Sequence, residues 1–138
     1  MPFRIDAKKK IFLATTADMS YAFAIRENGV PVNLHWGGRI DRLDDLTDES
    51  EISWFRISHY CGRAKSSRLE FPAYVPRHYY EPCLKLSSPD RALELMYESH
   101  RLENENHLIV TLREPGCGLV VNLHYELFPE FDLIQRCL

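Results

Sequence analysis

The segment Asn33–Leu46, with the sequence NLHWGGRIDRLDDL, brings together side chains that could bind a sugar. Trp36 supplies a flat aromatic face, and Asp44 and Asp45 supply carboxylates shortly after it. An aromatic face that meets a few polar groups is one form of a carbohydrate site. The alternative is that Trp36 belongs to the core and the charged loop after it is only solvated.

The acidic stretch Asp41–Glu51 is the densest group of carboxylates, with six Asp or Glu residues and few large apolar ones. A glycosidase needs two carboxylates held about 5 to 9.5 Å apart across the bond that it cleaves. A loop by itself rarely fixes such a geometry. We therefore expect a long exposed loop that contacts at most a ligand, and we assign no catalytic residue.

The histidines and cysteines show no spacing typical of a metal or redox site. No HxH, HExxH or CxxC pair is present. His59 and Cys61 would share a strand face as base and thiol, but such neighbours are common by chance. A small enzyme built on these residues is the weakest hypothesis, and we expect no metal and no cofactor. The residues considered are His35, His59, His78, His100, His107, His124, Cys61, Cys83, Cys117 and Cys137.

Size and charge exclude several classes of protein. The chain of 138 residues predicts one domain, residues 1–138, with a sizeable core. The net charge of −3 gives no reason to expect nucleic acid or an anionic membrane as a partner. No apolar run approaches the roughly 20 residues that span a bilayer, and no signal peptide follows the N-terminus. We expect a cytoplasmic protein with free thiols.

The elements that would hold Trp36 are strands. Tyr21, Phe23 and Ile25 alternate with smaller or polar residues, and Asn28-Gly29 favours a tight turn. Val32, Leu34 and Trp36 alternate on the way back, so we predict a hairpin with Trp36 on its apolar face. A short apolar run, residues 11–16, precedes it, and residues 54–60 predict another short strand.

The middle of the chain gives mixed signals. Residues 71–86 contain Pro72, Pro76 and Pro82, so we expect a loop or at most an edge strand. Residues 91–102 are rich in helix formers but also alternate with a period of two. We predict a strand there and keep a helix as the alternative.

The last third alternates most regularly. Residues 108–113 and 119–127 predict two strands around the turn EPGCG, and residues 131–138 predict a final one. The fold class is therefore all-β, an antiparallel β-sandwich. Because FDLIQRCL ends the chain without a polar tail, we expect the sandwich to be incomplete and the chain to be cut inside a larger protein.

Four stretches, in order, resemble the N-terminal β-sandwich domain of the α-galactosidases of glycoside hydrolase family 36. They are SYAFAIRENGVPVNLHWGGRI, LEFPAYVPRHYYEPCLKL, LELMYESHRL and HLIVTLREPGCGLVVNLHYELFPEFDLIQRCL. The last one agrees with the family down to Asp132, Ile134 and Arg136. The chain departs from the family at Val75, which replaces a glycine, and at residues 78–80, which replace Asp-Phe-Arg.

The resemblance implies a galactose-mutarotase-like supersandwich, of which this chain is roughly the first half. It implies a parent enzyme that hydrolyses α-galactosides such as melibiose and raffinose with retention, using two aspartates of a barrel that this chain lacks. It also implies a homo-oligomer in which the loop after the Trp-Gly pair reaches a neighbouring active site. Trp36 would close the hairpin, and Asp44 and Asp45 would be the candidate sugar contacts.

Two main hypotheses follow from these observations. The chain is either the non-catalytic N-terminal piece of a retaining α-galactosidase, or a stand-alone carbohydrate-binding or protein-interaction module. Half a sandwich would expose an apolar face and unpaired strand edges. We therefore expect the isolated chain to dimerise or to exchange strands.

Overall fold

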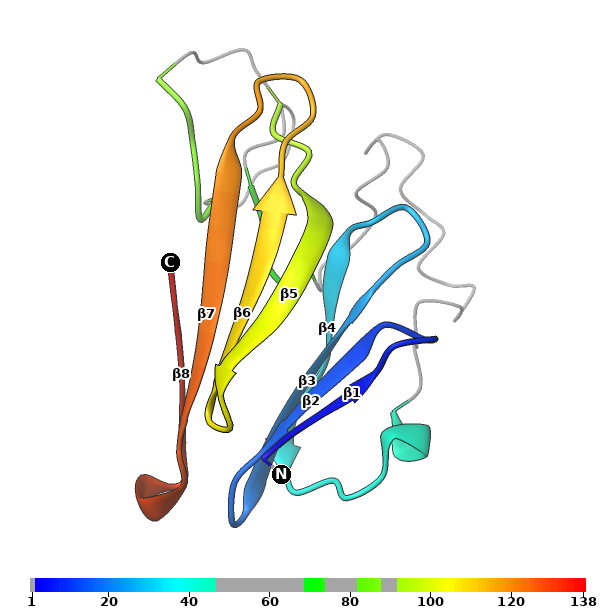
Figure 1. The fold of residues 1–138 in the computed structure, drawn as a ribbon, viewed down its shortest axis with the longest axis vertical. Coiled ribbons are helices and arrows are strands. Elements are labelled where there is room, and N and C mark those ends of the chain that lie inside the picture. Colours follow the sequence, from blue (N-terminus) through cyan, green and yellow to red (C-terminus); the bar gives the residue numbers. More distant parts are fainter. Residues whose placement is uncertain (1, 47–68, 74–81, 88–91) are drawn as a thin grey trace.

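The computed structural model describes residues 2–46, 69–73, 82–87 and 92–138, and these form two four-stranded antiparallel sheets (Figure 1). The strand orders are β1-β2-β3-β4 and β5-β6-β7-β8, so within each sheet every strand pairs with its neighbours in sequence. The predicted strand at residues 54–60 and the departures from the family at residues 75 and 78–80 lie outside these ranges.

The first sheet consists of β1 (Phe3–Asp6), β2 (Ile11–Thr15), β3 (Met19–Ile25) and β4 (Pro31–Gly38). The predicted turn joins β3 to β4. Gly29 adopts a φ of +81°, which a side chain at that position would disfavour. The Gly29 N–H donates to the Arg26 carbonyl over 2.8 Å, and the Val30 N–H donates to the Asn28 side chain over 3.2 Å.

The second sheet consists of β5 (Met96–Asn104), β6 (His107–Arg113), β7 (Val120–Phe128) and β8 (Leu133–Cys137). The strand prediction for residues 91–102 is confirmed from Met96 onward, and the helix alternative is wrong. The period-two pattern prevails over helix propensity because Leu93, Leu95 and Tyr97 all pack into the core cluster. Gly118, with φ +71°, lies in the predicted turn between β6 and β7.

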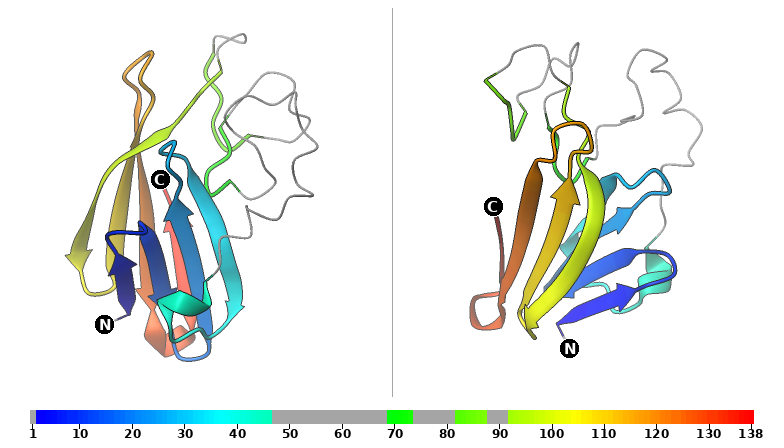
Figure 2. Two further views of the ribbon diagram at one scale, coloured as in Figure 1. Left: turned by 90° about the vertical axis from the view of Figure 1, so that its right-hand side faces the viewer. Right: turned by 45° about the horizontal axis from the view of Figure 1, so that its top comes forward.

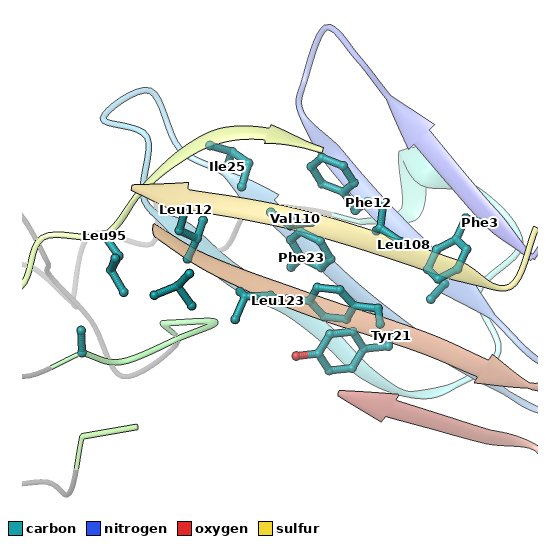
Figure 3. Packing of buried hydrophobic residues seen from close by; sticks show 14 of the residues in the cluster. Phe3, Phe12, Tyr21, Phe23, Ile25, Leu95, Leu108, Val110, Leu112 and Leu123 are labelled. Atoms are coloured by element: carbon teal, nitrogen blue, oxygen red, sulfur yellow. The ribbon is translucent and has the colours of Figure 1, made fainter. Parts of the chain in front are cut away.

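The two sheets pack face to face around one main core, which confirms the antiparallel sandwich (Figure 2). Aromatic rings join the layers: Phe12 stacks on Phe23 at a centroid distance of 4.7 Å, and Phe23 stacks on Tyr125 at 4.8 Å. Leucines and valines of β6 and β7 surround these rings (Figure 3). The alternating residues of β3, β6 and β7 therefore meet in this core as the sequence pattern predicted.

A second, smaller cluster covers the other face of the first sheet. Ile11, Leu13, Ala22, Ala24, Val32 and Leu46 are buried there. This explains why β2 is buried along its whole length. Of the predicted exposed loop, residues 47–51 lie outside the described ranges, and residues 41–46 are only partly exposed. Asp44 and Asp45 face solvent in the short 3-10 helix η1 (Leu43–Asp45), but Leu46 is anchored against the sheet. In Figure 1, η1 lies beside the first sheet, away from the second.

The prediction that Val32, Leu34 and Trp36 share one apolar face is wrong. Ala22 pairs with His35 but Phe23 pairs with Asn33, so Leu34 is an extra residue in a β-bulge. A bulge reverses the alternation of side chains beyond it. Val32 and Leu34 pack in the outer cluster, whereas Trp36 pairs with Tyr21, whose side chain faces the second sheet.

Asp132 links the two sheets at one end. It follows the 3-10 helix η4 (Pro129–Phe131) in a left-handed conformation with φ +50°. Its Oδ1 accepts hydrogen bonds from the Thr16 hydroxyl and from the Asp18 N–H, the latter over 3.1 Å. These hydrogen bonds, led by that from Thr16, lower the pKa of Asp132, so its carboxylate is the form that ties β8 to the turn between β2 and β3.

Candidate functional site

Trp36 is the most exposed large apolar side chain of the described residues, with 75% of its surface accessible. It is not a core residue, because the bulge at Leu34 and the end of the strand place it at the rim of the sandwich. Its ring and that of Tyr21 form a T-shaped pair with a centroid distance of 6.2 Å and an interplanar angle of 69°. The indole therefore packs against Tyr21 while most of its surface stays open.

A buried carboxylate holds Tyr21 in place. The Tyr21 hydroxyl lies 2.6 Å and 2.7 Å from the two carboxylate oxygens of Glu70, which is 1% exposed. The Tyr125 hydroxyl donates to the same carboxylate over 2.8 Å. Burying a charged group costs free energy unless the group is paired and hydrogen-bonded. These hydrogen bonds therefore offset the cost of placing the Glu70 carboxylate between the sheets.

Arg136 of β8 supplies the compensating charge. Its Nη1 lies 3.0 Å from Oε1 of Glu70 and 3.0 Å from the Glu70 carbonyl oxygen. The same nitrogen donates to the Tyr21 hydroxyl over 3.2 Å. The guanidinium side chain is 41% exposed, so it reaches from solvent into the buried group. We call Tyr21, Glu70, Tyr125 and Arg136 the Glu70 cluster.

The electrostatics of the Glu70 cluster keep its tyrosines neutral. Burial raises the pKa of Tyr21, and the Glu70 carboxylate raises it further. The same two causes, in the same order, raise the pKa of Tyr125 well above its ordinary value. Burial, the largest single cause, would lower the pKa of Arg136, but the charge and hydrogen bond of Glu70 together with the two tyrosines outweigh it and raise that pKa. The cluster is therefore a fixed arrangement of donors around the Glu70 carboxylate, and the raised pKa values of Tyr21, Tyr125 and Arg136 keep these three groups protonated near neutral pH.

The structure does not bring Trp36 together with the predicted carboxylates. Asp44 lies on the outer side of the first sheet, 3.5 Å from Lys9 Nζ and 3.9 Å from Arg42 Nη2. Both of these ion pairs are largely exposed. Asp45 is exposed on the same short helix, where its N–H donates to the Arg42 carbonyl over 3.2 Å. The predicted site residues thus lie in two separate places: Trp36 at the rim of the sandwich, and Asp44 and Asp45 in the acidic turn η1.

Sequence reasoning missed Glu70 as a site residue. A signal existed, because Glu70 is a lone charge between Leu69 and Phe71 in a short apolar stretch. Its partners Tyr21 and Tyr125 are 49 and 55 residues away, so no local pattern could connect them.

The described residues contain no group of three or more His, Cys, Asp and Glu side chains arranged to hold a metal ion. Cys83, Cys117 and Cys137 are free and exposed, and Cys61 lies outside the described ranges. The described part of the chain also has no helix long and apolar enough to cross a membrane. The arrangement around Trp36 is suited to binding, through an open aromatic ring on a rigid support, and none of the described residues adds a pair of carboxylates for hydrolysis to it.

Comparisons with known proteins bear on the fold and on the family of the chain. No curated protein sequence matched the chain. Among solved structures, the chain is similar to an α-galactosidase from Lactobacillus brevis, with a TM-score of 0.73, 20% identity and coverage of 96% of this chain and 21% of that one. It is also similar to the family 36 α-galactosidase AgaB from Geobacillus stearothermophilus, with a TM-score of 0.74, 18% identity and coverage of 99% and 22%.

A third similar structure is the galactosidase domain of the α-galactosidase–sucrose kinase AgaSK, with a TM-score of 0.70, 21% identity and coverage of 97% and 22%. The chain thus spans about a fifth of the length of each of these proteins. These likenesses establish the fold. The family described as "Glycosyl hydrolase family 36 N-terminal domain" matches residues 29–138, which is most of the chain, so the chain belongs to the N-terminal domain family of glycosyl hydrolase family 36.

Proposed function

We propose that this chain is the non-catalytic N-terminal part of a retaining α-galactosidase, acting in assembly and presenting Trp36 to a sugar at a neighbouring active site. The family match and the shared fold support this function. Hydrolysis of α-galactosides such as melibiose and raffinose would belong to the parent enzyme. The cytoplasm is the compartment that we propose, because three exposed cysteines are free thiols.

The observation that carries the proposal is the exposed indole of Trp36 on a rigid support. An aromatic ring that is 75% exposed gains little from the core of its own domain. Its neighbour Tyr21 is fixed by two short contacts to Glu70. A ligand-contacting ring that is held in place beforehand loses little freedom on binding, which favours affinity.

Asp44 and Asp45 enter the proposal as a second contact. They lie on the other side of the first sheet from Trp36, so a single small sugar bound to Trp36 would not reach them within this chain. We propose that the loop at residues 41–46 approaches the neighbouring subunit, where Asp44 and Asp45 contact the sugar. The weak, exposed ion pairs of Asp44 leave its carboxylate available for such a contact.

The test follows the indole N–H signals in a nitrogen-15 NMR spectrum of the chain while melibiose is added. The chain has two tryptophans, and Trp36→Phe assigns their signals. We expect a saturable shift of the Trp36 signal that Asp18→Asn, a change at an exposed position, leaves intact. A Trp36 signal that stays unmoved at high melibiose concentration would contradict the sugar contact.

A separate assay addresses catalysis. The chain alone should release no p-nitrophenol from p-nitrophenyl α-galactoside, because the described residues supply no pair of catalytic carboxylates. Hydrolysis that persists after repurification of the chain would contradict the non-catalytic role.

The stand-alone binding module remains the second candidate, since an exposed indole suits it equally. The mass of the native gene product, measured by immunoblot, separates the two functions. A product several times larger than 16.2 kDa supports the parent enzyme, and a product of 16.2 kDa supports the module.

Self-association forms the last part of the proposal. Both described sheets end in outer strands, β1 and β4 in one and β5 and β8 in the other. Outer strands carry unpaired backbone groups that favour pairing with another chain. Phe131 and Leu133, near the start of β8, are 74% and 46% exposed and add apolar surface. We expect a homo-oligomer in light scattering at micromolar concentration, and a monodisperse monomer would contradict this.

A further inference from the structure

Arg39 directly follows β4, where the chain leaves the first sheet and turns toward η1. Its Nη1 donates hydrogen bonds to the carbonyl oxygens of Thr16 and Ala17, each over 3.1 Å. Its Nε lies 2.8 Å from Oδ1 of Asp41, and its backbone N–H donates to the Asp18 carbonyl oxygen over 2.9 Å. One residue therefore joins the start of the acidic loop to the turn between β2 and β3.

The turn between β2 and β3 is held from two sides. Oδ1 of Asp132, which precedes β8, accepts hydrogen bonds from the Thr16 hydroxyl and from the Asp18 N–H. Arg39 takes carbonyl oxygens of the same turn. The donors of the turn are thus satisfied by a carboxylate and two of its acceptors by a guanidinium, as ordered backbone groups require. The turn is therefore a fixed support for Arg39, tied to the second sheet.

The loop beyond Arg39 is anchored on both sides of its acidic residues. The Ile40 N–H donates over 2.9 Å to the hydroxyl of Ser20, which is fully buried. Ile40 and Leu43 pack against the outer cluster, in which Leu46 is buried. The exposed side chains of η1 therefore project from a segment whose two ends are attached to the first sheet.

The neighbouring arginine of the loop shows how specific these contacts are. Nη2 of Arg42 lies 3.9 Å from Oδ2 of Asp44, and both side chains are 72% exposed. Exposed ion pairs of this kind contribute little. A guanidinium that donates several hydrogen bonds in a fixed planar arrangement defines a geometry that a single ammonium cannot. Arg39, in contrast to Arg42, therefore has contacts able to fix the course of the loop.

From these contacts we propose that Arg39 is the positioning residue of the acidic turn. It sets the direction in which η1 presents Asp44 and Asp45, and Asp132 acts through it by holding the turn between β2 and β3. The inference rests on the proposed function, in which Asp44 and Asp45 contact the sugar at a neighbouring subunit. A contact loop that is held in place beforehand loses little freedom on binding.

The test is amide hydrogen exchange of the full chain, followed by NMR. Opening of the loop in the wild-type chain must break the hydrogen bonds of the Arg39 guanidinium. In Arg39→Gln these bonds are absent, so we expect the N–H groups of Ile40 and Leu46 to exchange at least about tenfold faster. Arg39→Lys should behave almost like Arg39→Gln, because it keeps the charge and loses the planar arrangement of donors.

Two control variants separate positioning from a general loss of stability. Tyr125→Phe weakens the Glu70 cluster, whose contacts survive opening of the loop, so the exchange of Ile40 and Leu46 should keep its wild-type rate. Arg42→Gln removes the neighbouring arginine and should also leave these rates unchanged.

A further variant addresses the link to the second sheet. Asp132→Gly removes the carboxylate and tolerates the φ of +50° at this position. We expect it to accelerate the exchange of Ile40. Its effect should be much smaller in the Arg39→Gln background, because two residues that act through one contact are not additive. Equal effects in both backgrounds would show that Asp132 does not act through Arg39.

Light scattering distinguishes this inference from the proposed function. Arg39→Gln should weaken self-association as much as Asp44→Ala does. Wild-type exchange of Ile40 and Leu46 in Arg39→Gln, or complete restoration by Arg39→Lys, would overturn the positioning role. Faster exchange in Arg39→Gln, combined with wild-type association in Asp44→Ala, would keep the positioning role and count against the proposed contact with a neighbouring subunit.

Discussion

Glu70 and Asp44 are both carboxylates next to the first sheet, but the structure uses them in opposite ways. Glu70 is buried between the sheets, and it accepts hydrogen bonds from two tyrosines and an arginine. Asp44 lies on the other side, 72% exposed, in two loose ion pairs. The short, buried polar contacts of Glu70 therefore fix Tyr21, against which Trp36 packs. Asp44, in contrast, is exposed and is available for contact with a partner.

The largest expected effect comes from removing the Glu70 carboxylate. Glu70→Ala leaves the Arg136 charge and two buried hydroxyls without their acceptor, so we expect a loss of about 3 kcal/mol in the free energy of unfolding. Urea denaturation measures this loss. Glu70→Gln, which keeps the volume and one acceptor oxygen, should lose less. A loss below about 1 kcal/mol in Glu70→Ala would mean that the cluster does not hold the sheets together.

A smaller effect should follow from removing one hydroxyl of the cluster. Tyr125→Phe deletes a 2.8 Å hydrogen bond to a buried charge, which is worth about 1.5 to 3 kcal/mol. Tyr97→Phe is the matched control, because its hydroxyl contacts His100 Nδ1 in an exposed position. If both variants lost the same stability, burial of the cluster would not be the cause.

Alkaline pH should weaken the same cluster without any mutation. The folded-state pKa values of Tyr21 and Tyr125 lie above the value of about 10 in an unfolded chain. The unfolded chain therefore loses these protons first, so the free energy of unfolding is maintained up to about pH 10 and falls above it. Urea titrations at pH 8 to 11 measure the fall. In Tyr125→Phe the slope above pH 10 should be shallower, and an unchanged slope would point to other groups.

The same contrast explains what the sequence could and could not predict. Alternation in residues 108–113 and 119–127 was sufficient for β6 and β7, because alternate residues of both strands are apolar and pack into the core, although Ile109 is also buried on the other face of β6. The alternation did not predict the position of Trp36, because β3 is buried on both faces. Apolar residues of β4 can therefore pack against β3 on either face, and the sequence pattern does not decide which. The extra residue Leu34 becomes visible only in the pairing with β3.

The sequence also did not predict that the candidate site residues lie on different faces of the first sheet. Asp44 and Trp36 are close in sequence, but the bulge and the anchoring of Leu46 send them to different faces of the first sheet. Glu70 is distant from Tyr125 and Arg136 in sequence and meets them only when the two sheets close. Local patterns therefore predicted the strands well, but not the contacts that cross between sheets.

The smallest expected effect on stability belongs to the acidic turn, and it sharpens the comparison most. Asp44→Ala and Asp45→Ala should each change the free energy of unfolding by less than about 0.5 kcal/mol, because exposed ion pairs contribute little. The same variants should weaken self-association in light scattering if this loop meets a neighbouring subunit. Wild-type association in both variants, with stability also unchanged, would leave Trp36 as the only supported contact. A large loss of stability would instead show that the turn, like Glu70, serves the fold.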